Sequence, residues 1–320
     1  MPEDEQIEAQ THAPAEIDPA PAAVSETYLE PSKPRGIAPI WHTLLLVLAI
    51  LAYSAWGAIS ANSGSGNPIA SPGGAVRAAT AGVDNVRLIR YALTGALELG
   101  IVVWIAFGLR LRKVPFRSLF GAWPKGLNAI TMEILIAAAF WVCSMSILLI
   151  CALSWLFVQT HIYRHETAKQ SAPSSQSSPN SPKPKSPEQQ QSELIHQLTE
   201  LAPANGIEIA AWGFLCLIVG FSEEIIFRGY MQSQAIALLR NTPIAVIVAA
   251  IVFGAAHGYQ GVRGIFLVSI FGSLFGIITL LRKNLLPGMI AHSWHDFATG
   301  MALALIRSSH LLDHLSAAPK

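Results

Sequence analysis

The stretch that decides the fold is Ile207–Arg228, with the sequence IEIAAWGFLCLIVGFSEEIIFR. It is mostly apolar as far as Gly220, and Glu223, Glu224 and Arg228 then follow without a break. A charge at the bilayer centre costs about 2.5–3.5 kcal/mol on insertion scales, so charged residues there are functional candidates. In an α-helix Glu224 and Arg228 can pair on one face, whereas Glu223 points about 100° away and stays free for chemistry. The alternative is a polar helix end at the lipid headgroups.

The composition predicts a membrane protein. Hydrophobic residues make up 52% of the 320 residues and charged residues only 13%. Several apolar segments approach or exceed the roughly 20 residues that cross a bilayer. We therefore expect an all-α, polytopic transmembrane bundle of about seven spans, a multi-pass protein of the cell membrane. A formal net charge of +1, with no dense basic patch, argues against a nucleic-acid partner. The three cysteines lie in apolar segments without metal-ligand spacing, so we expect core thiols and no structural disulfide: Cys143, Cys151 and Cys216.

Two polar regions divide the chain. Residues 1–36 are rich in carboxylates, Pro and Ala, and residues 160–202 are rich in Pro, Ser and Gln. Neither can bury enough apolar surface to order itself, so we expect a disordered acidic tail and a disordered linker. The remaining domains are then N-terminal transmembrane helices at 37–159, a catalytic transmembrane domain at 203–307 and a C-terminal tail at 308–320.

The apolar segments and the basic residues between them predict a topology. The expected spans are 40–60, 88–109, 127–157, 204–239 (with a break near Gly229 as an alternative), 243–257, 262–281 and 285–306. Lys and Arg in short connections mark the cytoplasmic side, and they cluster before the first span, at 110–125 and at 282–283. The N-terminus is therefore expected inside and the C-terminus outside. Glu98 and Glu133 are lone acids without a motif, and we interpret them as structural.

Two further segments bring polar groups into apolar helices. His257 ends the run Phe253-Gly-Ala-Ala-His257, and His292 and Asp296 stand four apart in His292-Ser-Trp-His-Asp296. Each His taken singly is more often a hydrogen-bonded structural residue. Ionisable groups on three separate apolar helices are expensive unless they meet in one polar cavity. We therefore expect these groups to converge with Glu223.

The ordered motifs Glu-Glu-x-x-x-Arg, Phe-x-x-x-His and His-x-x-x-Asn/Asp resemble those of the CPBP family. This family comprises intramembrane CAAX proteases and bacteriocin-processing (Abi) proteins, and it includes the Rce1-type prenyl-protein endopeptidases. The resemblance covers residues 204–306 and leaves out the tail, the first three spans and the linker. Asp296 stands where the prenyl-protein proteases carry Asn, which leaves the substrate class open.

The resemblance implies a role for each motif residue. Glu223 and His257 would hold and deprotonate the attacking water, and His292 would donate to the oxyanion. Asp296 would also donate if protonated, and if ionised it would instead orient His292 or favour its imidazolium form. Glu224 and Arg228 would fix the motif helix, with His295 as a supporting residue. A divalent metal such as zinc, held by Glu223, His257 and His292, is an alternative. We favour the glutamate mechanism without a cofactor over the metallopeptidase.

Three functions are compatible with the sequence. The first is a CAAX-type endopeptidase that cuts a membrane-tethered or lipidated peptide within the bilayer. The second is a non-catalytic scaffold or immunity protein of the same fold, but every motif position here is filled by a residue competent for the chemistry. The third is a proton-coupled transporter, which is disfavoured because no internal repeat of interrupted helices is found.

Overall fold

The structure is a computed structural model that describes residues 36–62, 85–170, 191–192, 194–195 and 198–309. The elements in these ranges are helices, with one isolated β-bridge between Gly121 and Asn284 and no β-strand. The predicted all-α fold class is therefore confirmed. The acidic tail, except Gly36, and most of the Pro/Ser linker lie outside the described residues.

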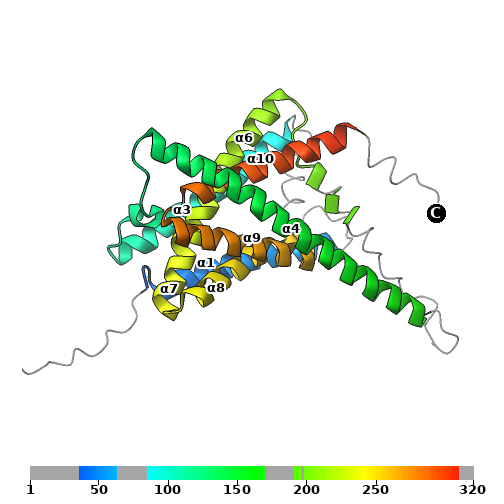
Figure 1. The fold of residues 1–320 in the computed structure, drawn as a ribbon, viewed down its shortest axis with the longest axis horizontal. Coiled ribbons are helices and arrows are strands. Elements are labelled where there is room, and N and C mark those ends of the chain that lie inside the picture. Colours follow the sequence, from blue (N-terminus) through cyan, green and yellow to red (C-terminus); the bar gives the residue numbers. More distant parts are fainter. Residues whose placement is uncertain (1–35, 63–84, 171–190, 193, 196–197, 310–320) are drawn as a thin grey trace, which may run out of the picture. The chain divides into compact units, whose positions relative to one another are not determined.

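A helix occupies each of the seven segments in which the sequence predicts one (Figure 1). Before the linker these are α1 (Ile40–Asn62), α3 (Val86–Leu111) and α4 (Leu127–Gln170), and the short 3-10 helix η1 (Phe116–Phe120) lies between the last two. After the linker they are α6 (Gly206–Glu223), the π-helix η2 (Glu224–Gln232), α7 (Ser233–Leu239), α8 (Thr242–Ala256), η3 (Gly258–Gln260), α9 (Gly261–Arg282) and α10 (Leu286–Ser308).

Four helical stretches of the described chain are long and apolar enough to cross a membrane: Val86–Leu111, Leu127–His165, Gly206–Leu239 and Gly258–Arg282. Ile40–Trp56 and Thr242–Ala256 are apolar but shorter. The length and apolar composition of these helices indicate a membrane protein. The count of seven spans stays a prediction. Helix α10 is not among the four, and it carries His292, His295 and Asp296 in its middle.

Helix α4 is longer than predicted. It continues past Phe157, the expected end of the third span, to Gln170. Residues 158–170 contain no Gly or Pro and include good helix formers such as Gln, Arg, Glu and Lys, and the first proline comes only at Pro173. The helix therefore includes the first residues of the segment assigned to the linker.

The helix formed by α6, η2 and α7 is the central element. In its most apolar part, 39% of the residues are buried, whereas the corresponding share in α4 is 11%. Helix α10 packs along α6, and α9 packs along α8. Large aromatic side chains fill the core between them, among them Phe227, Tyr230, Phe253 and Phe275. Many exposed Leu, Ile, Val and Phe side chains remain on α1, α3 and α4, as expected for helices that face lipid.

Two asparagines set the starts of α6 and α8. The side chain of Asn205 accepts a hydrogen bond from Glu208 N at 2.9 Å, and that of Asn241 accepts one from Ile244 N at 3.0 Å. These N-caps satisfy backbone donors that have no partner within the helix. They fix where the two helices that carry Glu223 and His257 begin.

A buried chain of hydrogen bonds holds α1 against η2 and α7. His42 Nε2 donates to the carbonyl of Trp104 at 2.9 Å, so its Nδ1 accepts from the Tyr230 hydroxyl, also at 2.9 Å. Tyr230 Oη lies 2.8 Å from Thr43 Oγ1, which accepts from Gln234 Nε2 at 3.1 Å. Each donor along this chain has an acceptor, as buried polar groups require.

All three cysteines are free. Cys216 on α6 is buried, as expected for a core thiol, whereas Cys151 is only partly buried. The placement of Cys143 in the core was wrong, because it is exposed on α4, whose apolar surface is mostly uncovered.

Candidate active site

The two motif glutamates lie where the helix changes type. Glu223 is the last residue of α6, and Glu224 is the first residue of the π-helix η2. Because π-helical turns are rare and occur frequently at functional sites, this segment is a functional candidate from its backbone alone. The predicted helix over this segment is continuous and contains a π-helical stretch, so the alternative of a break near Gly229 was wrong.

Two side chains tether η2 to α9. Arg228 Nη2 donates to the carbonyl of Gly272 at 3.3 Å, and Gln232 Nε2 donates to that of Gly276 at 3.2 Å. The two donors on η2 are four residues apart, and so are the two acceptors on α9. The same side-chain-to-carbonyl contact is therefore made on two successive helical turns. The bonds satisfy buried groups on both helices and hold the wide turn in place.

Glu224 and Arg228 form the ion pair that their spacing predicts. Arg228 Nη1 lies 2.8 Å from Glu224 Oε1, and the side chains are 2% and 0% exposed. The guanidinium also lies 4.3 Å from the ring centroid of Phe253 and 5.2 Å from that of Phe275. Such contacts stabilise a desolvated cation. The pair is therefore a buried structural element of the core.

His292 contacts three carboxylates of the site. Its Nδ1 lies 3.0 Å from Glu224 Oε1, and its Nε2 lies 3.4 Å from Glu223 Oε2 and 4.0 Å from Asp296 Oδ2. Since the Glu224 carboxylate is already paired with Arg228, it accepts, and Nδ1 carries the hydrogen. Nε2 then faces the two more accessible acids, whose side chains are 13% and 26% exposed.

A close approach of α6 and α10 brings His292 to the glutamates. A Cβ atom on Gly220 would overlap the backbone and the hydroxyl of Ser293, so only glycine permits this separation. Ser293 follows His292 directly, and Gly220 precedes Glu223 by less than one turn. The packing of these two small residues therefore sets the distance between the imidazole and the carboxylates.

His257 is held separately at the end of α8. Its Nδ1 donates to the carbonyl of Phe253 at 3.0 Å. On both sides of it, Ser54 of α1 donates to the carbonyl of Ala255 and accepts from Gly258 N. These bonds fix the backbone around the imidazole and leave Nε2 for another partner.

Glu223 pairs with His292, and its approach to His257 around a shared water stays a prediction. In the described part of the chain, no hydrogen bond or ion pair joins His257 to Glu223, His292 or Asp296. Phe253 contacts both imidazoles, with ring centroids 5.0 Å from His257 and 6.0 Å from His292. The two histidines thus flank one aromatic ring.

Glu98 belongs with this cluster, although no motif in the sequence predicts that position. It lies on α3, which packs against α6, and it interacts electrostatically with Glu223, His292 and Asp296. Its Oε2 atom is buried without a hydrogen-bond partner. Glu133, the other lone acid, instead bonds Arg282 at 2.6 Å, which supports its structural interpretation.

The arrangement does not fit the metal-ion alternative. Within the described residues, no three His, Cys, Asp or Glu side chains are grouped so as to hold a metal ion. The two nitrogens of His292 face carboxylates, and Nδ1 of His257 is bonded to its own helix. We therefore route no chemical step through a metal.

These features define a class: a helical membrane protein with buried carboxylates and an imidazole on three packed helices. Residues 205–298 match the family model of the type II CAAX prenyl endopeptidase Rce1-like proteins. The match begins at the N-cap of α6 and includes Glu223, His257, His292 and Asp296. The resemblance drawn from the three motifs is therefore confirmed for this segment. No curated protein and no solved structure matches the chain.

Proposed function

We propose that the chain is a CAAX-type intramembrane endopeptidase that hydrolyses a membrane-tethered or lipidated peptide. The observation that carries the proposal is the 3.4 Å approach of Glu223 to His292 inside an Rce1-like domain. A carboxylate beside an imidazole, partly open on one side and buried on the other, can activate water and transfer its proton.

Glu223 acts as the general base. It removes a proton from water as the water oxygen bonds to the scissile carbonyl carbon, and it returns that proton to the leaving amine when the C–N bond breaks. Because Nδ1–H of His257 is committed to Phe253, its Nε2 can accept a hydrogen bond from the same water. Glu223 and His257 would then hold the nucleophile from two sides.

His292 and Asp296 stabilise the charge that develops on the carbonyl oxygen. A proton on His292 Nε2 can be donated to the oxyanion, and a negative Asp296 at 4.0 Å favours that proton. Glu224 holds Nδ1 and so fixes the ring in one orientation. Glu224 and Arg228 therefore position the histidine and do not react themselves.

The test is cleavage by the purified full-length protein in detergent micelles. One fluorogenic peptide ends in a prenylated Cys-aliphatic-aliphatic-X motif, and a second has the same sequence without the prenyl group. We expect the lipidated peptide to be cut, with no cut by Glu223→Gln. Repeating the assay with a chelator, alongside metal analysis of the protein, separates the glutamate mechanism from the metallopeptidase alternative.

Failure to cut any lipidated or membrane-tethered peptide, by a protein shown to be folded, would instead favour the non-catalytic scaffold. In that case neither the wild type nor Glu223→Gln would cleave the peptide, and the two proteins would have the same membrane insertion and thermal stability.

A further inference from the structure

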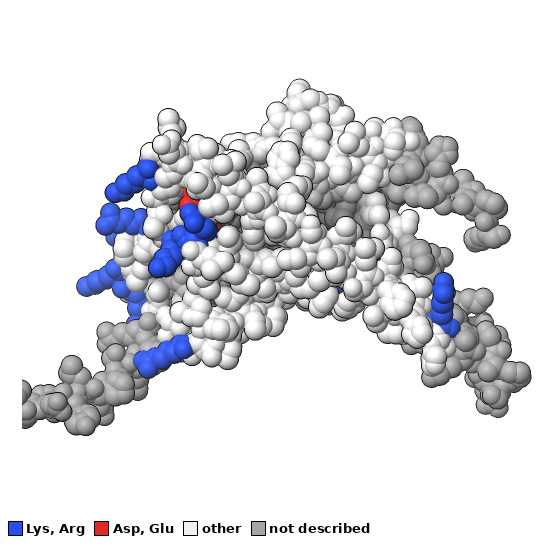
Figure 2. All heavy atoms as spheres, in the orientation of Figure 1, with Lys and Arg blue, Asp and Glu red and all other residues white. Residues whose placement is uncertain are grey.

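Positive charge is concentrated at one end of the described helices. Residues 110–126, which join α3 to α4, and residues 282–285, which join α9 to α10, hold seven Lys or Arg and no Asp or Glu. Figure 2 shows Lys and Arg atoms gathered at this end, with few acidic atoms beside them. Arg282 is paired with Glu133, but the side chains of Arg112 and Arg117 form no ion pair or hydrogen bond with any described residue.

This end lies where candidate membrane spans begin and end. The connection follows the last residue of one candidate span, Leu111, and precedes the first residue of the next, Leu127. A third candidate span ends at Arg282, beside the same connection. Whichever side of the membrane it occupies, the segment must therefore lie near the phosphate layer.

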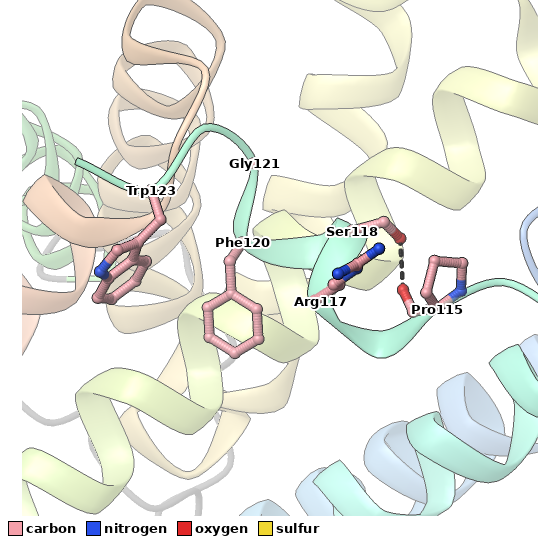
Figure 3. A pocket seen from close by; sticks show the side chains of 6 residues that line it. All are labelled: Pro115, Arg117, Ser118, Phe120, Gly121 and Trp123. Carbon is pink, nitrogen blue, oxygen red and sulfur yellow. Dashed lines mark hydrogen bonds between the residues drawn. The ribbon is translucent and has the colours of Figure 1, made fainter. Parts of the chain in front are cut away.

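A pocket is built into this connection. It has a volume of about 580 Å³ and is lined by Pro115, Arg117, Ser118, Phe120, Gly121 and Trp123, which we call the headgroup pocket. Figure 3 shows the Arg117 guanidinium and the rings of Phe120 and Trp123 along this one stretch of chain. The two rings contact edge to face with centroids 5.9 Å apart. The pocket lining thus includes one cation and two aromatic rings.

The pocket is preformed by backbone contacts. Ala122 N donates to Lys283 O at 2.8 Å, and Leu285 N donates to Phe120 O at 3.2 Å. Gly121 has a positive φ of 71°, and a Cβ there would overlap the Lys283 carbonyl. Ser118 Oγ donates to Pro115 O at 2.7 Å within the same stretch. Little ordering is then left for a ligand to impose.

We propose that the headgroup pocket binds the phosphate of an anionic phospholipid. Arg117 would donate to the phosphate oxygens from its planar fork, which suits phosphate bidentately. Phe120 and Trp123 would pack on the glycerol and the first acyl methylenes, the position that aromatic residues favour at membrane interfaces. The surplus of positive charge selects an anionic over a zwitterionic lipid. The site is independent of the proposed peptidase.

The experiment measures quenching of Trp123 by brominated lipids. The full-length protein is reconstituted in phosphatidylcholine vesicles with the same small fraction of brominated phosphatidylglycerol or brominated phosphatidylcholine. Subtracting the signal of Trp123→Phe isolates Trp123 from the other seven tryptophans. We expect the phosphatidylglycerol to quench Trp123 at a lower mole fraction. Arg117→Gln should raise the required fraction about tenfold, as for loss of one charge-assisted hydrogen bond.

Arg112→Gln is the matched control, because it removes the same charge from an exposed residue outside the pocket lining. It should keep the preference for phosphatidylglycerol. Equal quenching by both lipids, or an equal loss in the two Gln variants, would overturn the proposal in favour of diffuse attraction. Competition by inorganic phosphate beyond that of chloride at equal ionic strength would also overturn it, by assigning the pocket to the free ion. Thermal unfolding confirms that each variant is folded.

Discussion

His292 and Glu224, 68 residues apart in the sequence, are joined by a hydrogen bond of 3.0 Å between Nδ1 and Oε1. The same carboxylate oxygen accepts from Arg228 at 2.8 Å. The guanidinium therefore fixes the acid, the acid fixes the imidazole, and the imidazole presents Nε2 to Glu223. A residue pair that looks structural in the sequence thus orients the proposed chemistry.

Replacing Glu223 by Gln should abolish peptide cleavage and leave the fold intact. The amide keeps the size of the side chain but cannot take a proton, and loss of a general base costs about 10²–10⁴-fold in rate. The rate is measured with the lipidated peptide, and folding by thermal unfolding in detergent. Glu188→Gln, in the linker, is the control with the same chemical change. Normal cleavage by Glu223→Gln would mean that another group is the base.

Replacing Arg228 by Met should destabilise the protein strongly, because it leaves Glu224 charged in the core. Breaking a buried pair by removing one partner costs about 3–5 kcal/mol. The double variant Glu224→Gln/Arg228→Met should lose less than the sum of the two single variants, since no buried charge is stranded. Thermal or denaturant unfolding of all three measures this. Strictly additive losses would show that the two side chains do not interact.

Replacing Tyr230 by Phe should lower stability by about 1–3 kcal/mol. The substitution removes the hydroxyl that satisfies His42 Nδ1 and contacts Thr43, and a buried group left without a partner costs about this much. Tyr53→Phe removes a hydroxyl from a residue that is 53% exposed and should change little. Equal unfolding midpoints for the two variants would contradict the role of this network.

Replacing Glu98 by Leu should raise thermal stability. The substitution removes a partly buried acid that has an unsatisfied oxygen and neighbours of the same charge, a group whose burial costs free energy. If Glu98 contributes to the electrostatics of the site, cleavage should fall in the same variant. Lower stability, measured by thermal unfolding, would instead indicate that Glu98 has a favourable partner such as bound water.

The basic connections predict which side of the membrane each loop occupies. In a background without Cys143, Cys151 and Cys216, Lys125→Cys should react with an impermeant thiol reagent only from the cytoplasmic side. Ser177→Cys, in the linker, should react only from the other side. The reverse pattern, or labelling of both from one side, would require a different number of crossings.

The helices and the ion pair could be predicted because they depend on local sequence. Apolar length located the seven predicted helical segments, and the four-residue spacing paired Glu224 with Arg228. The contact of Glu223 with His292 depends on how closely α6 approaches α10, which Gly220 and Gly300 both permit. Glu98 could not be assigned for a similar reason, since nothing near it in the sequence reports that α3 packs on α6. The π-helix also lacks a local signal, because its apolar pattern resembles that of an ordinary helix.

The π-helix makes the length of residues 224–232 as important as their chemistry. Upstream of it, Glu223 faces α10, and at its far end Tyr230 faces α1. Each residue of an α-helix turns the chain by about 100°, so deleting one residue here would rotate everything that follows by roughly that angle. Tyr230 and Gln234 would then leave their partners on α1 even though no side chain had changed. The segment should therefore tolerate no insertion or deletion.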